Sequence, residues 1–364
     1  MCVARRFFFA RSADSCRHPG STCSHARFRA AVNLGLQGGG AHGAFTWGVL
    51  DALLQDGRLT LASVSGTSAG AMNAVALAQG LMAGGPDGAR QALDTFWTAV
   101  AASAPFEMAS LSADGQRVVL PPAVRLMLQW SQMLAPEQFN PFGANPLRDI
   151  LLTQVDFERL RRDCPLPVFI AATHAHTGQL RLFRAHELSA EAVLASACLP
   201  NLHHTVQVDG QPYWDGGYAA NPPVWPLLQA SPHSDVLLVL LSPLTHPDTP
   251  TSASGIRHRT LEFAFNGAFL REMRLLAQWQ RQAQTGWLRL GQLERKLAGA
   301  RFHLIDAPER LTALGTESKL VATLPIFRHL MTLGREHAQA WLDRHATSVG
   351  QRSTVDLASV FGAD

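Results

Sequence analysis

The sequence predicts an α/β fold built around a mostly parallel sheet. Two strand-like runs are each followed by a glycine-rich turn and then by helical periodicity, and this order is typical of βαβ units. Hydrophobic residues make up 47% of the 364 residues and charged residues only 16%, so the chain has enough apolar side chains for a large buried core. No internal repeat or low-complexity tract interrupts the pattern.

The first strand–turn–helix unit begins with a β-run at residues 31–37 and turns at the three glycines of residues 38–40. A helix is then expected from Ala41 to about Leu54. The apolar residues that indicate it recur at intervals of four, at Phe45, Val49 and Leu53.

The second unit has a strand at residues 61–65, a turn at residues 66–70 and a helix that runs to about Met82. Glycine and proline at residues 84–86 are expected to end this helix. Further strands are expected at five places: residues 166–173, 179–183, 206–209, 236–242 and 301–305.

The charge balance argues against nucleic acid as a partner. The chain has 31 basic and 28 acidic residues, a net charge of +3, and the charges are dispersed. Residues 1–30 hold six Arg and one Asp, so 25 basic and 27 acidic residues remain beyond them, a net of −2. Attraction to an anionic lipid surface must therefore come from a local patch. No apolar run approaches the ~18 residues that a membrane-spanning helix needs.

Residues 1–30 are expected to form a disordered extension or to result from an upstream start codon, because they are Arg-rich and lack periodicity. The same composition also fits an organellar transit peptide, whereas the apolar run is too short for a secretory signal. We expect residues 31–364 to form one domain. Only Cys164 and Cys198 lie beyond the extension, so no disulfide framework is expected. A cytoplasmic location is favoured, with or without peripheral contact to the membrane.

Two segments leave a structural and a functional interpretation open. Residues 105–146 are broken by prolines and hold an apolar cluster, which predicts a helix packed over the sheet or, alternatively, a lid or apolar wall. Residues 261–298 have a helical pattern that predicts a helix covering the sheet, although a basic amphipathic helix can also lie on an anionic membrane. The apolar side of this second pattern consists of Phe265, Phe269, Met273 and Leu276.

The motif GGGAHG at residues 38–43 follows a strand and opens a helix. This is the setting of a dinucleotide-binding loop, but such a loop needs an acidic residue at the end of the second strand, and residues 65–68 read SGTS instead. Neither lysine follows a glycine, which excludes a Walker A loop. Unshielded backbone N–H groups at a helix N-terminus favour negative charge, so the glycine run is suited to an oxyanion hole.

The motif GTSAG at residues 66–70 lies between a predicted strand and a predicted helix. This G-x-S-x-G pattern places a serine on a tight turn, where Gly66 and Gly70 avoid collisions with neighbouring backbone. The turn exposes the hydroxyl of Ser68 and directs the N-terminus of the next helix at it. Ser68 is therefore a candidate nucleophile.

A serine nucleophile needs a base that accepts its proton. Asp215 follows a β-like run and precedes Gly216 and Gly217, which permit close backbone approach. The aromatic residues before it, Tyr213 and Trp214, would raise the pKa of its carboxyl group. The same residues also fit an ordinary turn.

Four histidines are candidate metal ligands. His174 and His176 would lie on one face of a strand, but no acidic residue or third histidine follows them at a useful spacing. The neighbouring His203 and His204 are expected in core or surface packing, or at the rim of a site. We therefore expect no metal site.

The order GGGAHG, GTSAG, ASACLP and DGG, in these structural contexts, closely resembles the patatin-like phospholipases. The resemblance extends from residue 31 to about residue 357. It implies a three-layer α/β/α sandwich. It also implies hydrolysis of a lipid or simpler ester through an acyl-serine intermediate, without a metal or other cofactor.

The resemblance further implies roles for individual residues. Ser68 matches the nucleophile and Asp215 the general base of a dyad that contains no histidine. The oxyanion hole would consist of Gly38, Gly39, Gly40 and the amide of Ala69. Other motif glycines would support the turns: Gly43, Gly66, Gly70, Gly216 and Gly217.

One position departs from the family pattern, and one other class of function remains open. Many members carry Arg or Lys where this chain has His42, and a neutral imidazole would weaken any charge contribution there. A preference for phospholipid headgroups is therefore not implied. The alternative to an active hydrolase is a peripheral membrane or partner-binding protein that keeps the fold with little turnover.

Overall fold

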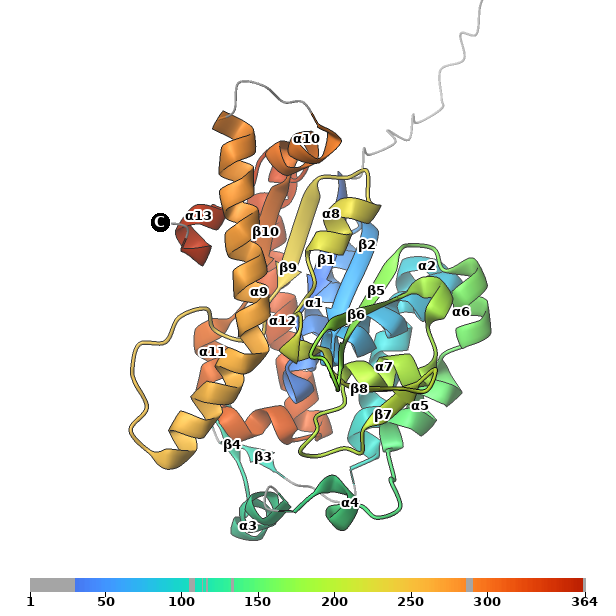
Figure 1. Cartoon of the computed structure of the whole chain (residues 1–364), viewed down its shortest axis with the longest axis vertical. Helices are drawn as coiled ribbons and strands as arrows, with labels where there is room; N and C mark the ends of the chain where they lie inside the picture. Colours follow the sequence, from blue (N-terminus) through green and yellow to red (C-terminus); the bar gives the residue numbers. More distant parts are fainter. Residues whose placement is uncertain are drawn as a thin grey trace, which may run out of the picture.

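The computed structural model describes residues 30–104, 109–112, 114–115, 117–131, 134–285 and 291–362. The extension predicted at residues 1–30 lies, up to residue 29, outside these described residues. The centre of the molecule is an eight-stranded sheet in the order β10-β9-β1-β2-β5-β8-β7, with β6 beside β5 (Figure 1). Its strands are β1 (Ala30–Leu36), β2 (Leu59–Thr67), β5 (Val168–His174), β6 (Leu180–Arg184), β7 (Val206–Val208), β8 (Gln211–Asp215), β9 (Asp235–Val239) and β10 (Arg301–Ile305).

The sheet is mixed but mostly parallel, which confirms the predicted fold class. The strands from β10 through β9, β1 and β2 to β5 are parallel, and β6, β7 and β8 join with antiparallel pairings. All the expected strands are present, displaced by at most a few residues. A separate two-stranded sheet consists of β3 (Ser110–Leu111) and β4 (Val118–Val119).

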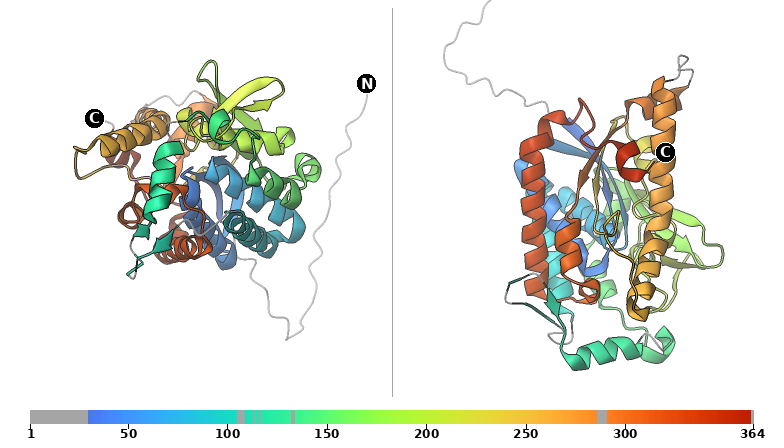
Figure 2. Two further views of the ribbon diagram at one scale, coloured as in Figure 1. Left: turned by 90° about the horizontal axis from the view of Figure 1, so that it is seen from below. Right: turned by 90° about the vertical axis from the view of Figure 1, so that its left-hand side faces the viewer.

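Helices lie on both faces of the sheet and make the three layers. The α-helices are α1 (Gly43–Asp56), α2 (Ala69–Ala102), α3 (Pro122–Ser131), α4 (Pro136–Phe139), α5 (Pro146–Gln154), α6 (Phe157–Asp163), α7 (Ala190–Ser196), α8 (Trp225–Ala230), α9 (Ala253–Thr285), α10 (Gln292–Gly299), α11 (Pro308–Ala313), α12 (Leu324–His345) and α13 (Leu357–Phe361). Short 3₁₀ turns are η1 (Gly40–His42), η2 (Ala185–Glu187), η3 (Gly216–Tyr218), η4 (Thr316–Leu320) and η5 (Ala346–Ser348). The right-hand view of Figure 2 shows the sheet between α12 on one face and α9 on the other.

The two faces of the sheet carry separate hydrophobic clusters, and β9 contributes to both. Val236 and Leu238 belong to the cluster under α9, whereas Leu237 and Val239 belong to the cluster under α1, α2 and α12. Side chains alternate between the faces of a strand, so a strand that is covered on both sides needs a continuous apolar run. This explains why the sequence shows no polar alternation there.

The helix after β2 breaks where the sequence predicts an end. Gly84 and Gly85 have non-helical dihedral angles, and the chain starts a second helical part at Pro86. In the described structure, α2 therefore has two helical parts. The sequence patterns did not predict the second part, which ends at Ala102.

The long pattern at residues 261–298 is confirmed as helical and covers the sheet, apart from residues 286–290, which lie outside the described residues. It begins earlier, at Ala253, and is divided into α9 and α10. Its expected apolar side is buried against the sheet at Phe269, Met273 and Leu276, with Phe265 partly buried. Among the described residues, no helix combines the length and the apolar character that crossing a bilayer requires.

The segment at residues 105–146 differs from the predicted helix over the sheet. Figures 1 and 2 show α3 and α4 beyond the carboxyl ends of the parallel strands and not over a sheet face. Val124 is buried, but Trp130 is 65% exposed and Phe142 is 95% exposed. The apolar residues predict a helix here, but they do not show whether this helix packs against the sheet.

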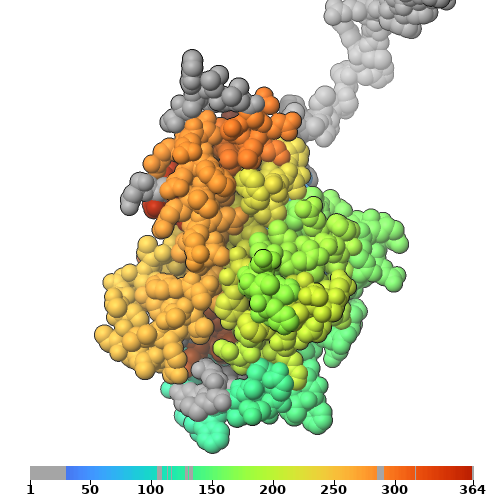
Figure 3. Space-filling model, viewed as in Figure 1, coloured from blue at the N-terminus to red at the C-terminus, as the bar shows by residue number. Residues whose placement is uncertain are grey.

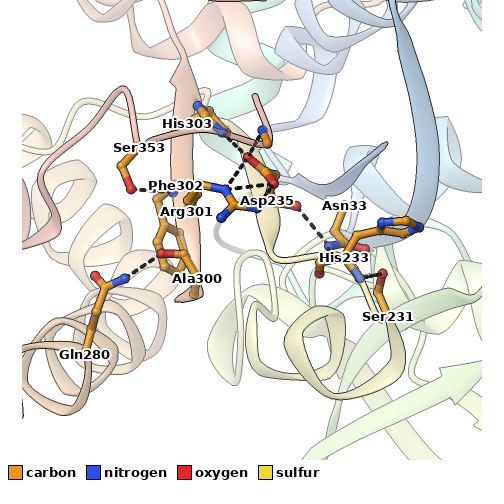
Figure 4. A network of polar contacts seen from close by, with 11 residues as sticks. Asn33, Ser231, His233, Asp235, Gln280, Ala300, Arg301, Phe302, His303 and Ser353 are labelled. Atoms are coloured by element: carbon orange, nitrogen blue, oxygen red, sulfur yellow. Dashed lines mark hydrogen bonds and ion pairs between the residues drawn. The ribbon is translucent and has the colours of Figure 1, made fainter. Parts of the chain in front are cut away.

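A polar network joins the strands at their amino ends (Figure 4). Arg301 donates three hydrogen bonds to the carboxylate of Asp235, two from Nε at 3.1 Å and one from Nη2 at 2.9 Å, and the ring nitrogen Nε2 of His303 lies 3.1 Å from the same carboxylate. The N–H of Gly350 also donates to Asp235, and the amide of Asn33 donates to its carbonyl oxygen. Burial alone would raise the pKa of Asp235, but the hydrogen bonds of His303, Arg301 and Gly350 with its carboxylate outweigh burial and lower the pKa to about 2. The network connects β1, β9, β10 and the C-terminal segment.

Candidate active site

Ser68 lies at the carboxyl end of β2 and precedes α2, as the sequence predicts. Its dihedral angles, φ 54° and ψ −120°, fall in a region that non-glycine residues rarely adopt, and such strain is concentrated at functional sites. A Cβ atom on Gly66 would lie 2.4 Å from the carbonyl oxygen of Gly70. One on Gly70 would lie 2.1 Å from the carbonyl oxygen of Leu36. The turn therefore requires glycine on both sides of the serine.

Asp215 ends β8 and is fully buried. The N–H of Gly217 donates a 2.8 Å hydrogen bond to its Oδ1. Burial raises the pKa of Asp215 to about 7, although the hydrogen bond from Gly217 and the side chain of Ser68 act in the opposite direction. A Cβ atom on Gly216 would lie 2.2 Å from the carbonyl oxygen of Ala171, so this glycine allows the turn to rest against β5.

The sheet register brings Ser68 and Asp215 together. Thr67 of β2 pairs with Ala171 of β5, and Asp215 of β8 pairs with the next residue, Ala172, on the same edge of β5, because β6 occupies the other edge. Among the described residues, Oδ2 of Asp215 is buried without a hydrogen-bond partner. A buried carboxylate oxygen with no partner, adjacent to a serine that contributes to its pKa, is positioned to accept a proton.

One segment, ASACLP at residues 195–200, contacts the backbone of both residues. The hydroxyl of Ser196 accepts a 2.9 Å hydrogen bond from the N–H of Ser68. The carbonyl oxygen of Cys198 accepts a 2.8 Å hydrogen bond from the N–H of Asp215. The hydroxyl of Thr173 donates to the carbonyl oxygen of Asp215 at 2.8 Å. These contacts fix the two candidate residues relative to each other.

The glycine loop, which consists of residues 38–43, lies directly against Ser68. A Cβ atom on Gly38 would lie 2.8 Å from the Cβ of Ser68, and one on Gly43 would lie 2.6 Å from the Cβ of Ala69. The N–H of Gly38 donates a 2.7 Å hydrogen bond to Oδ1 of Asn221, so in this structure it is already engaged. Within the described part of the chain, three other amides of the expected oxyanion hole make no hydrogen bond: those of Gly39, Gly40 and Ala69.

Two amide side chains that the sequence analysis did not select hold the glycine loop. Asn221 binds Gly38, as described above, and Gln37 connects the ends of the central strands. Oε1 of Gln37 accepts hydrogen bonds from the N–H groups of Leu241 and Ser242, at 2.6 and 2.9 Å, and its Nε2 donates to Asn266 at 3.1 Å. For Gln37, the sequence offered one indication of this role, because it is a polar residue directly after a buried strand.

His42, near the end of the same loop, is buried and carries no positive charge near pH 7. Its Nε2 lies 2.6 Å from the hydroxyl oxygen of Ser318. Burial, and secondarily the nearby Lys319, lower the pKa of His42 to about 3. The imidazole is therefore neutral near pH 7, as the sequence analysis assumed.

The other candidate histidines do not converge. Nε2 of His204 lies 2.7 Å from the carbonyl oxygen of Asn140, which joins the loop after ASACLP to the α4 region. Nε2 of His174 lies 3.1 Å from Oε1 of Gln211 at an exposed position. In the described ranges, no group of three or more His, Cys, Asp or Glu side chains is arranged to hold a metal ion.

The site combines three groups that together can perform acyl transfer. They are a serine with a strained backbone, a buried carboxylate with a raised pKa, and backbone N–H groups that make no hydrogen bond among the described residues. The carboxylate can accept the hydroxyl proton, and the amides can stabilise a developing oxyanion.

The chain is similar to a known protein family and to solved structures. The family model described as patatin-like phospholipase matches residues 34–228. Among solved structures, the chain is similar to VipD from Legionella pneumophila, with a TM-score of 0.43 and 17% identity over 86% of this chain and 67% of that chain. It is also similar to the complex of full-length SpcU and ExoU from the type III secretion system of Pseudomonas aeruginosa, with a TM-score of 0.29 and 17% identity over 91% of this chain and 76% of that chain. No curated protein matches the chain.

Proposed function

The chain belongs to the patatin-like phospholipase family, whose model matches more than half of it, and from this premise we propose that it is a serine acyl hydrolase acting on lipid esters. Ser68 is the nucleophile and Asp215 the general base. The observation that carries this proposal is the buried Oδ2 of Asp215, which has no partner among the described residues and belongs to a carboxyl group whose pKa is raised to about 7. A base with a pKa near the working pH is effective in proton transfer.

The reaction proceeds in two steps through an acyl-serine. In the first, the Ser68 oxygen attacks the ester carbonyl carbon while Asp215 takes the hydroxyl proton. The tetrahedral oxyanion is stabilised by the amides of Gly39, Gly40 and Ala69. Cleavage of the ester C–O bond releases the alcohol, which receives the proton from Asp215.

In the second step, water attacks the acyl-serine carbonyl and gives its proton to Asp215. The Ser68 oxygen leaves and takes the proton back from Asp215, which restores the enzyme and frees the fatty acid. Asp215 carries every proton in this scheme, so we propose that no metal or other cofactor takes part.

The apolar surface beyond the strand ends supports a lipid as the substrate. Five exposed apolar side chains lie in one stretch, at Leu126, Trp130, Leu134, Phe139 and Phe142. The stretch is joined to the rim of the site by the contact between Asn140 and His204. Exposed apolar side chains concentrated in one segment indicate an interaction surface, and a lipid surface is the partner that also presents the substrate.

Two properties of the whole chain complete the proposal. We assign residues 31–364 to one domain, because β9 and β10, which follow the matched family range, complete the same sheet as β1. We place the protein in the cytoplasm, at least partly at the membrane surface, on the same cysteine argument as above. The two described cysteines, Cys164 and Cys198, are unpaired.

The test is labelling with a serine-reactive fluorophosphonate, combined with assays on a panel of phospholipids and short esters. The wild-type protein is expected to react at Ser68 and to hydrolyse at least one class of ester, and Ser68→Ala is expected to do neither. Ser103→Ala, at the end of α2, is the matched control and should behave as wild type. Absence of labelling in wild type, with lipid binding retained, would favour the alternative of a binding protein with the hydrolase fold.

A further inference from the structure

The proposed oxyanion hole takes its donors from two separate segments of the chain. Gly39 and Gly40 belong to the glycine loop, which follows β1, whereas Ala69 begins α2, which follows β2. Preorganised donors stabilise an oxyanion only while their N–H groups keep fixed positions relative to one another. The contacts that join the loop to the start of α2 therefore belong to the geometry of catalysis.

One buried side chain bridges the two segments. Asn73, in the second turn of α2, is completely buried. Its Nδ2 donates hydrogen bonds to the carbonyl oxygen of Gly43, at the end of the glycine loop, and to that of Ala69, both at 3.0 Å. Within the described part of the chain, the bond to Gly43 is the one hydrogen bond between the glycine loop and residues 68–73. The polar connection between the two parts of the hole thus depends on Asn73.

Trp97, in the second helical part of α2, fixes the orientation of the Asn73 amide. Its Nε1 donates a 3.0 Å hydrogen bond to Oδ1 of Asn73. An indole N–H can only donate, so the amide oxygen must face it and the Nδ2 group must face the two carbonyl oxygens. The ring of Trp97 also touches the loop, since its Cζ2 and Cη2 atoms would lie 2.9 Å from a Cβ atom on Gly43. Phe327 of α12 packs edge-on against the same ring, with the centroids 4.9 Å apart.

This network is enclosed by protein on every side. Figure 3 shows the side of the molecule that α9 covers. Trp97 and Phe327 belong instead to the hydrophobic cluster on the opposite face of the sheet, under α1, α2 and α12. Asn73 is 0% exposed and Trp97 is 4% exposed, so neither side chain can touch a substrate. Any effect of these residues on the reaction must act through the groups that they hold.

We propose that Asn73, oriented by Trp97, is a positioning residue that fixes the two parts of the oxyanion hole relative to each other. The inference rests on the proposed function and deepens it, because it assigns a catalytic consequence to residues that do not contact the substrate. The hydrogen bonds of Asn73 keep the amides of Gly39 and Gly40 aligned with that of Ala69 before the substrate arrives. A misplacement of about 1 Å in such a site can lower the rate about 100-fold.

The first test is the effect of Asn73→Leu on hydrolysis of a soluble short-chain ester. Leucine has nearly the same size as asparagine but offers no donor to the loop. The variant is expected to lower kcat about tenfold or more with little change in KM, because the hole acts on the transition state. Trp97→Phe keeps an aromatic ring and removes the N–H that orients Asn73, so a smaller loss of kcat in the same direction is expected.

Asn33→Leu is the matched control, because Asn33 is equally buried and makes the same kinds of hydrogen bond at the amino ends of the strands. Its Nδ2 donates to the carbonyl oxygens of His233 and Asp235, at 3.0 and 2.9 Å, and its Oδ1 accepts from the hydroxyl of Ser63 at 2.7 Å. This variant is expected to lose a similar amount of stability, measured as melting temperature, and to retain kcat. Equal losses of kcat in Asn73→Leu and Asn33→Leu would overturn the inference.

A second readout reports the oxyanion hole directly. It is the ratio of kcat/KM for an ester to that for the thiono ester, in which sulfur replaces the carbonyl oxygen. Sulfur accepts hydrogen bonds weakly, so an intact hole favours the oxygen ester and a distorted hole loses this preference. Asn73→Leu and Trp97→Phe are expected to lower the ratio, and Asn33→Leu is expected to leave it unchanged. A ratio that stays at the wild-type value in Asn73→Leu contradicts the proposed role, whatever happens to kcat.

A structural measurement separates this inference from the proposed function. Crystal structures of the wild type, Asn73→Leu and Asn33→Leu are compared by the distance between the amide nitrogens of Gly40 and Ala69. A change of about 0.5 Å or more is expected in Asn73→Leu alone, which is the tolerance of a catalytic site. This change supports the positioning role even if the wild type hydrolyses no ester, in which case the proposed function is wrong. An unchanged distance overturns the inference even in an active enzyme.

Discussion

The hydroxyl of Ser196 accepts the backbone N–H of Ser68 at 2.9 Å, which ties the strained turn to the segment that also binds Asp215. Two residues further on, the carbonyl oxygen of Cys198 accepts the N–H of Asp215. The segment thus sets the geometry of the dyad without contributing a reacting group. Ser196 is a positioning residue.

Ser196→Ala is expected to lower kcat about tenfold with little change in KM, because it loosens the turn that aims the nucleophile. The N–H of Ser68 would lose its acceptor, which costs about 1–3 kcal/mol of stability. Ser189→Ala is the control on the same helix: its hydroxyl accepts the N–H of Ala192, so stability falls while kcat is retained. Equal losses of kcat in both variants would show that Ser196 acts only through stability.

The pH dependence of kcat/KM should report Asp215. Its pKa is about 7, and only the ionised carboxylate can accept the proton of Ser68. The rate is therefore expected to rise about tenfold per pH unit below about pH 6 and to level off above about pH 8. Glu272 provides the control, because burial also raises its pKa to about 7 while it binds the N–H groups of Val224 and Trp225. Glu272→Gln should leave the profile unchanged. A shifted inflection in this variant would mean that the profile reports the ionisation of Glu272 and not that of Asp215.

Asp215→Asn should reduce activity by about 10³ or more and yet stabilise the protein above neutral pH. A carboxyl group whose pKa is raised on folding binds its proton more tightly in the native state. Its contribution to stability is therefore present below the unfolded pKa and lost as the pH rises through about 7. The melting temperature of Asp215→Asn should exceed that of wild type at pH 8 but not at about pH 4.

Asp235→Asn tests the sign of this argument. The pKa of Asp235 is lowered to about 2, so its stabilising effect is present above the unfolded pKa and lost as the pH falls through the folded value. Asp235→Asn should therefore lower the melting temperature at pH 8, opposite to Asp215→Asn. The same direction of change in both variants would contradict the assignment of the two carboxyl environments.

Local patterns predicted the strands, the break at Gly84 and Gly85 and the positions of Ser68 and Asp215, because each depends on residues adjacent in the chain. Contacts between distant segments were not predictable in this way. Ser196, Asn221 and Lys319 are polar residues without periodicity, and each acquires its partner more than 100 residues away in the folded chain. The position of α3 was left open for a related reason, since an apolar helix has the same sequence pattern whether or not the rest of the protein covers it.

The exposed apolar surface of the α3–α4 region should affect hydrolysis of membranes but not of soluble esters. Trp130 and Phe142 are 65% and 95% exposed at the carboxyl edge of the sheet. Transfer of such side chains out of water contributes about 1.5–3 kcal/mol each when burial is complete, so their combined removal should weaken vesicle binding about tenfold or more. The double variant Trp130→Ala and Phe142→Ala is measured by vesicle sedimentation and by rates on vesicles and on a monomeric short-chain ester.

Trp279→Ala is the control for this experiment. Trp279 is 43% exposed but lies near the carboxyl end of α9, at the opposite end of the molecule from α3 (Figure 1). If the α3–α4 surface contacts the lipid, only the double variant loses rate on vesicles, and both proteins hydrolyse the monomeric ester as wild type does. An equal loss on the monomeric ester would instead mean that the aromatic side chains act on the catalytic site itself, because a surface that only adsorbs to vesicles has no effect on a substrate free in solution.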